Sequence, residues 1–195
     1  MVEKKVNEEL SGIILMGGTS RRMGEDKSVL LVQGKPLYLH ATEKLEPYCE
    51  HIFLSANKHQ ALHTKYELPL IIDQYDDQGP LGGILSSLEC VQKSIFVLAV
   101  DMPYITGAEI QLLLNSRKQG QHVSLYYNSE ANKYEAMFSI WEISVLPILK
   151  SFFSGGGRSA QSLLRALDVP GIPMEDNLPF RSVNTTDEWA AIEKN

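Results

Sequence analysis

A glycine-rich segment behind a short apolar run constrains the fold of this chain more than any other feature. Residues 13–16 read Ile-Ile-Leu-Met, which is typical of a buried strand, and residues 17–24 read Gly-Gly-Thr-Ser-Arg-Arg-Met-Gly. Glycine lets backbone N–H groups approach an anion closely, and arginine adds a fixed fork of donors for phosphate oxygens. Lys27 follows as an exposed, mobile cation. These residues predict a strand followed by a loop that wraps phosphates.

The glycine spacing does not match two better-known phosphate loops. A dinucleotide-binding loop needs G-x-G-x-x-G, whereas Gly17 and Gly18 are adjacent and the next glycine is Gly24. A P-loop ends in G-K-[ST], whereas a glutamate follows Gly24. A plain turn between a strand and the next element stays open, although such a turn has no use for Arg22 and Lys27.

Length and composition limit the class of protein. The 195 residues suit a single domain, and the net charge of −6 argues against a nucleic-acid partner, because no basic excess can displace counterions. No apolar run reaches the ~18 residues of a membrane span. Cys49 and Cys90 form no C-x-x-C pattern, which indicates a reducing compartment. Residues 1–10 are rich in charged side chains and are expected to be a loose leader. We expect a soluble cytoplasmic protein with neither a nucleic acid nor a membrane as partner.

Apolar runs and helical patterns alternate along the rest of the chain. Strands are expected at 52–54, 70–72, 95–100, 122–128 and 136–141. Helices are expected at 36–46, 84–92, 143–153 and 159–167. This alternation predicts an α/β fold, a three-layer α/β/α sandwich with a mainly parallel central sheet, formed by one domain over residues 1–195.

The most hydrophobic strand, 95–100, ends on Asp101-Met102-Pro103. The carboxyl end of a central parallel strand opens onto the ligand crevice of such sheets. A helix-capping role is the alternative for Asp101, but Thr106 with Glu109 already forms the capping box of the next helix. Because Mg²⁺ is usually held by one or two carboxylates plus substrate phosphates, Asp101 is the candidate metal ligand.

Residues 15–27 resemble the signature L-A-G-G-x-S-x-R-M-G-x-D-K of molybdenum cofactor guanylyltransferases, with Met16 in place of the usual alanine. These enzymes are Rossmann-like nucleotidyltransferases of the glycosyltransferase-A type. Residues 31–37 are similar to the family's L-x-x-G-x-P-L, residues 79–83 to its G-P-L-x-G and residues 101–103 to its D-x-P. Residues 182–185 resemble its N-x-N-T, with Ser182 in place of the first asparagine, so that Asn184 is the residue carried over.

The resemblance implies transfer of GMP from GTP to molybdopterin (Mo-molybdopterin), with Mg²⁺ as cofactor and pyrophosphate as the second product. Arg22 and the loop would hold the β- and γ-phosphates, Lys27 would neutralise charge at the α-phosphate, and Asp101 would hold Mg²⁺. These three are the predicted catalytic residues. The predicted nucleotide-binding residues are Leu15, Gly17, Gly18, Thr19, Ser20, Arg22, Gly24, Lys27, Asn57, Asp73, Gly79, Pro80, Leu81 and Asn184.

Three other functions stay open. A molybdopterin cytidylyltransferase or a sugar-phosphate nucleotidyltransferase would share the loop and Asp101, although Leu15 and residues 79–81 favour guanine. A regulatory nucleotide-binding module would not need Lys27 and Asp101, and an NAD-dependent oxidoreductase has a different glycine spacing. Arg158 could equally meet an acceptor phosphate or be solvated. The resemblance leaves contacts with molybdoenzyme maturation proteins open.

Overall fold

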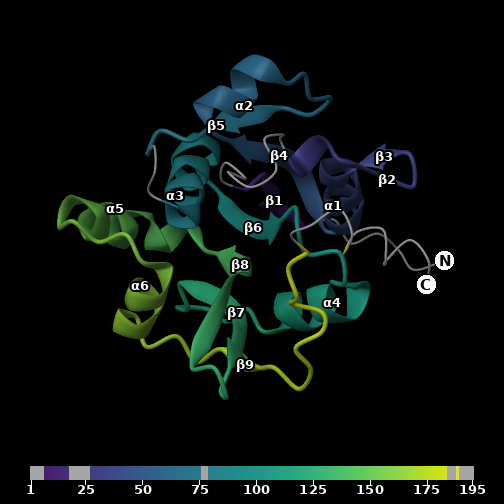
Figure 1. Ribbon diagram of the computed structural model, residues 1–195. Helices are drawn as coiled ribbons and strands as arrows, with labels where there is room; N and C mark the ends of the chain where they lie inside the picture. Colours follow the sequence, from purple (N-terminus) through teal and green to yellow (C-terminus); the bar gives the residue numbers. More distant parts are fainter. Residues whose placement is uncertain (1–6, 18–26, 76–78, 184–187, 189–195) are drawn as a thin grey trace.

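The computed structural model describes residues 7–17, 27–75, 79–183 and 188, and a seven-stranded sheet lies at its centre (Figure 1). Along the sheet the order is β5 (Leu70–Ile72), β4 (Cys49–Ala56), β1 (Asn7–Leu15), β6 (Ser94–Ala99), β8 (Lys133–Trp141), β7 (Val123–Asn128) and β9 (Ile172–Pro173). The first four strands are parallel, β8 is antiparallel to both of its neighbours, and β7 pairs parallel with β9. The predicted mainly parallel sheet is confirmed.

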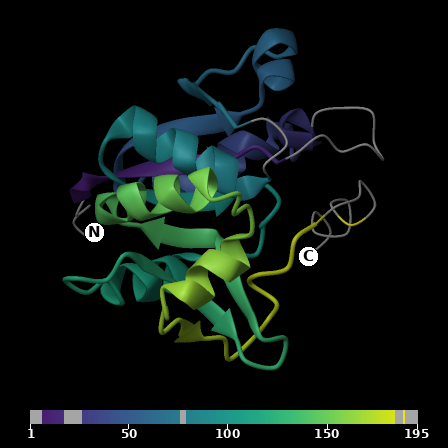
Figure 2. The ribbon, with the colours of Figure 1, turned by 90° about the vertical axis from the view of Figure 1, so that its left-hand side faces the viewer.

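Helices cover both faces of this sheet (Figures 1 and 2). One face carries α1 (Leu37–Leu45) and α4 (Gly107–Asn115), and the other carries α3 (Pro80–Val91), α5 (Leu146–Ser154) and α6 (Ala160–Ala166). The remaining elements are η1 (Lys27–Val29), the β2 (Leu31–Val32) and β3 (Lys35–Pro36) hairpin, α2 (Lys58–His63) and η2 (Ile143–Val145). Two apolar clusters, one on each side of the sheet, make the predicted α/β/α sandwich.

Two expectations about element bounds were wrong. Residues 7–10 are not a loose leader, because β1 begins at Asn7 and Leu10 is fully buried opposite Ser94 of β6. The helix expected from Ile84 begins at Pro80, since proline at the first helical position has a preset backbone angle. Residues 1–6 lie outside the described part of the chain. Among the described residues, no helix combines the length and apolar character that a membrane crossing requires.

Strand β6 lies at the middle of the sheet. It is fourth in the order of seven, and every one of its residues is buried. On one side lie β1, β4 and β5, whose carboxyl ends meet that of β6 at one edge. On the other side lies β8, which is antiparallel and therefore brings its N-terminal end to the same edge. Ligands of open parallel sheets bind at this edge.

Candidate active site

Four of the predicted site residues within the described part follow the carboxyl ends of the parallel strands. Gly17 comes two residues after β1, Asn57 directly after β4, Asp73 directly after β5, and Asp101 two residues after β6. The structure therefore brings four segments of the chain to one edge of the sheet (Figure 1). The predicted residues that lie outside the described part are Gly18, Thr19, Ser20, Arg22, Gly24 and Asn184.

Lys27 and Asp101 form an ion pair at this edge. Lys27 Nζ lies 3.3 Å from Asp101 Oδ2, and the two side chains are 9% and 25% exposed. The expectation that Lys27 is an exposed loop residue was wrong, because Lys27 lies in η1. Its neighbour Ser28 is fully buried, with its hydroxyl 3.3 Å from the Tyr66 hydroxyl. The two predicted catalytic groups are thus held together by the fold.

The backbone around Asp101 is fixed by three contacts. The Val183 N–H donates to the Asp101 carbonyl at 2.9 Å, which ties the C-terminal segment to this loop. Lys44 of α1 donates to the carbonyls of Pro103 and Ile105 at 2.9 and 2.6 Å. Burial lowers the pKa of Lys44, while the charge of Glu109 raises it. Asp101 therefore projects from a loop that α1 and the C-terminal segment hold in place.

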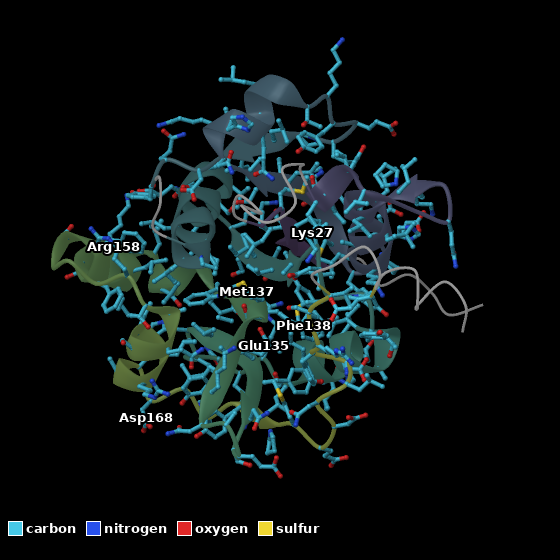
Figure 3. The ribbon with its side chains drawn as sticks, in the orientation of Figure 1. Lys27, Glu135, Met137, Phe138, Arg158 and Asp168 are labelled. Carbon is cyan, nitrogen blue, oxygen red and sulfur yellow. The ribbon has the colours of Figure 1, made fainter. Side chains whose placement is uncertain are left out.

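Glu135 of β8 lies near Asp101 and was not among the predicted site residues. Burial raises the pKa of Glu135, and the Asp101 charge raises it further, against the opposing effects of the Met137 N–H and Lys133. Figure 3 labels Glu135 close to the centre of the molecule, beside Met137 and Phe138. The sequence placed this strand at 136–141, one residue too late to include it, whereas β8 begins at Lys133.

Asp73 organises the loop that leads from β5 to α3. Its Oδ1 accepts from the Tyr75 N–H at 2.8 Å and from the Ser86 hydroxyl at 3.0 Å. A Cβ added at Gly82 would lie 3.0 Å from the Tyr75 carbonyl oxygen and 3.1 Å from Asp73 Oδ2. Gly82 therefore belongs to a close contact between helix and loop, and the nucleotide-binding role of Asp73 stays a prediction.

The other nucleotide-side residues have structural roles that their sequence context explains. Asn57 caps α2 in a reciprocal capping box with Gln60. Gly79, at the N-terminus of α3, has a φ of +64°, which favours glycine. Leu15 and Leu81 have side chains in the core between the sheet and α3. Their contribution to a nucleotide pocket stays a prediction.

Arg158 is not brought to this edge. It lies on the loop between α5 and α6, where it donates to the carbonyls of Phe153 and Gly157 at 2.8 and 2.6 Å. Its guanidinium also lies 5.0 Å from the centre of the Phe153 ring. Figure 3 shows it far to one side of Lys27 and Glu135.

The donor set fits a magnesium ion that completes its coordination with substrate oxygens. Among the described residues, no group of three or more His, Cys, Asp or Glu side chains could hold a metal ion. Mg²⁺ does not need such a cage, because it keeps several waters and binds one or two carboxylates plus phosphates. Asp101 Oδ2 already pairs with one cation in this structure, the Lys27 ammonium at 3.3 Å.

The family model of the MobA-like NTP transferase domain matches residues 12–170. That range contains Lys27, Asp101 and Glu135. The chain belongs to this family.

Curated relatives and solved structures agree with this membership. The molybdenum cofactor guanylyltransferase of Histophilus somni is 32% identical over 189 residues, which are 95% of each chain. The molybdenum cofactor biosynthesis bifunctional protein of Synechocystis is 28% identical over 185 residues, 94% of this chain and 53% of that protein. This chain thus spans about half the length of the Synechocystis protein.

The crystal structure of the molybdopterin-guanine dinucleotide biosynthesis protein A from Archaeoglobus fulgidus has the same fold. Its TM-score is 0.76 at 24% identity, and the match covers 94% of this chain and 97% of that chain. The resemblance to this family in residues 15–27 is therefore confirmed.

Proposed function

We propose that this protein is a molybdenum cofactor guanylyltransferase that transfers GMP from GTP to molybdopterin (Mo-molybdopterin) and releases pyrophosphate. The observation that carries the proposal is the Lys27–Asp101 ion pair at the carboxyl edge of the sheet. It brings together a cation that would bind phosphate and a carboxylate that would bind the metal. The Histophilus somni relative, named as a guanylyltransferase and similar along 95% of its length, supports guanine as the base.

The reaction proposed here needs positioning and charge stabilisation rather than a protein nucleophile. The terminal phosphate of the acceptor attacks the α-phosphorus of GTP, and the bond to pyrophosphate breaks as the new P–O bond forms. The acceptor phosphate is already ionised, so no general base has to remove a proton. Lys27 and the residues of the glycine-rich loop, Arg22 among them, hold the phosphates and neutralise their charge.

Asp101 would hold Mg²⁺ together with phosphate oxygens of the nucleotide. When bound there, Mg²⁺ neutralises charge on the reacting phosphates. Lys27 would pair with a phosphate in place of Asp101. Asn57, Asp73 and residues 79–81 would line the nucleotide side of the site.

A direct assay tests the proposal. Purified protein is incubated with each of the four NTPs, Mg²⁺ and molybdopterin, and nucleotide transfer and pyrophosphate release are measured. We expect GTP to be used, and its affinity by calorimetry to exceed that of CTP by about tenfold or more, because a polar mismatch at a base edge discriminates strongly. Equal or reversed affinities would refute the guanine assignment and leave nucleotidyl transfer standing. A cytoplasmic location and contacts with molybdoenzyme maturation proteins belong to the same proposal.

A further inference from the structure

Glu135 lies at the same edge of the sheet as Asp101, because β8 runs antiparallel to β6. The antiparallel register runs from Ile95↔Trp141 to Leu98↔Phe138. Asp101, on the turn after β6, and Glu135, within β8, each lie three residues beyond the last of these pairs, at the same edge of the sheet. The influence of the Asp101 charge on Glu135 agrees with this proximity.

The strand is irregular at this position. Leu125 pairs with Ser139 and Tyr127 with Tyr134, so two steps along β7 correspond to five along β8. The three extra residues of β8 form a bulge directly beside the site. Bulges are frequent next to active sites, where they redirect a side chain.

Side chains of β8 hold this bulge in one shape. The Met137 N–H donates to Glu135 Oε1 at 3.1 Å, and the Ser139 hydroxyl donates to the Ala136 carbonyl at 2.8 Å. One oxygen of Glu135 is therefore used inside the bulge. Within the described part of the chain, the other oxygen, Oε2, makes no hydrogen bond or ion pair.

The position of Glu135 relates it to the second substrate rather than to the nucleotide. The predicted nucleotide-side residues follow β1, β4 and β5, all on one side of β6. The reaction joins two substrates at Asp101, so the acceptor has to approach from the β8 side. Glu135 is a charged residue that β8 brings to this edge, where the Asp101 charge acts on it.

We propose that Glu135 is an acceptor-binding residue, and that its Oε2 accepts a hydrogen bond from an N–H or O–H group of the acceptor. This inference rests on the proposed function and deepens it. A reduced pterin carries ring N–H and amino donors, which suit a carboxylate oxygen. Hydrogen bonds to a charged acceptor are about twice as strong as neutral ones, and a site built to accept such a donor rejects molecules that lack it.

Glu135→Gln is the informative variant. The amide oxygen can still accept from the Met137 N–H, which preserves the bulge, but an NH₂ group then replaces the accepting oxygen. We expect the affinity for molybdopterin, measured by equilibrium binding without nucleotide, to fall by about tenfold or more. The KM for molybdopterin should rise by a similar factor. The GTP affinity should stay within about twofold of wild type, and so should the Mg²⁺ midpoint, the Mg²⁺ concentration that gives half-maximal GMP transfer. Glu130→Gln, on the exposed turn before β8, is the matched control.

Each other outcome is decisive. A raised Mg²⁺ midpoint with unchanged molybdopterin affinity would make Glu135 a metal ligand and overturn the inference. Equal losses for both substrates with a lower Tm would make its role purely structural and overturn it as well, as would no change at all. If the wild type binds GTP but does not transfer GMP to molybdopterin, the proposed function fails, and this inference with it. Normal wild-type transfer with unchanged acceptor binding in Glu135→Gln removes this inference alone.

Discussion

Asp101→Asn keeps the shape of the side chain and removes its charge. In the protein without nucleotide, the carboxylate is paired with Lys27 at 3.3 Å. GTP that binds without Mg²⁺ must separate this pair and place its phosphates beside the Asp101 charge. Removing that charge should therefore strengthen the binding of metal-free GTP and weaken the effect of Mg²⁺.

The structure sets the size of the effects. At 3.3 Å and an effective dielectric constant of about 20, the Coulomb attraction is about 5 kcal/mol before desolvation. Exposed pairs contribute about 0.2–1 kcal/mol, and breaking a buried pair costs about 3–5 kcal/mol. With side chains 9% and 25% exposed, this pair lies between the two cases, so Asp101→Asn should lose about 1–3 kcal/mol of stability. A chain of this length then loses several degrees of Tm.

Calorimetric titration with GTP, once in EDTA and once in Mg²⁺, measures how strongly GTP binding depends on Mg²⁺. A thermal melt is the folding control. Wild type should bind GTP more tightly with Mg²⁺. Asp101→Asn should lose most of this difference, bind metal-free GTP about tenfold more tightly, and turn over about 10² times more slowly. Asp168→Asn, exposed and distant in Figure 3, is the matched control. If Asp101→Asn binds GTP with the same Mg²⁺ dependence as wild type, the metal is held elsewhere.

Three further predictions concern Lys27, Gly79 and Glu142. Lys27→Ala should lower turnover by about 10²–10³ and, because it leaves Asp101 without its cation, lower Tm in a thermal melt; an unchanged rate would remove Lys27 from the chemistry. Gly79→Ala should cost about 1 kcal/mol in denaturant unfolding, since φ is +64° there, and equal stability would contradict the strain. Burial raises the pKa of Glu142, but hydrogen bonds from Arg117 and Ser94 lower it overall. The contribution of Glu142 to stability should therefore be fully present above its ordinary pKa. It should be lost as the pH falls through the lowered pKa of the folded protein. Unfolding measured against pH should show a weaker acid dependence for Glu142→Gln, and identical pH profiles would contradict this.

The amino-acid sequence by itself determined the features that depend on short segments. Apolar runs locate the strands, because such a run is complete within a few consecutive residues and can be recognised from the sequence alone. The Thr106–Glu109 capping box and the turn residue Gly79 likewise act within a few residues. The motif in residues 15–27 identified the family before any contact was known.

The tertiary structure decided what depends on residues far apart in the chain. Lys27 and Asp101 are 74 positions apart, and the burial of their ion pair follows from the packing of η1 beside the end of β6. Leu10 belongs to the core because β1 pairs with β6, although charged residues precede it in sequence. Glu135 lies at this edge because β8 runs antiparallel to β6 and carries a bulge there. Strand order, register and bulges arise from pairing between distant segments, and a local sequence pattern does not encode that pairing.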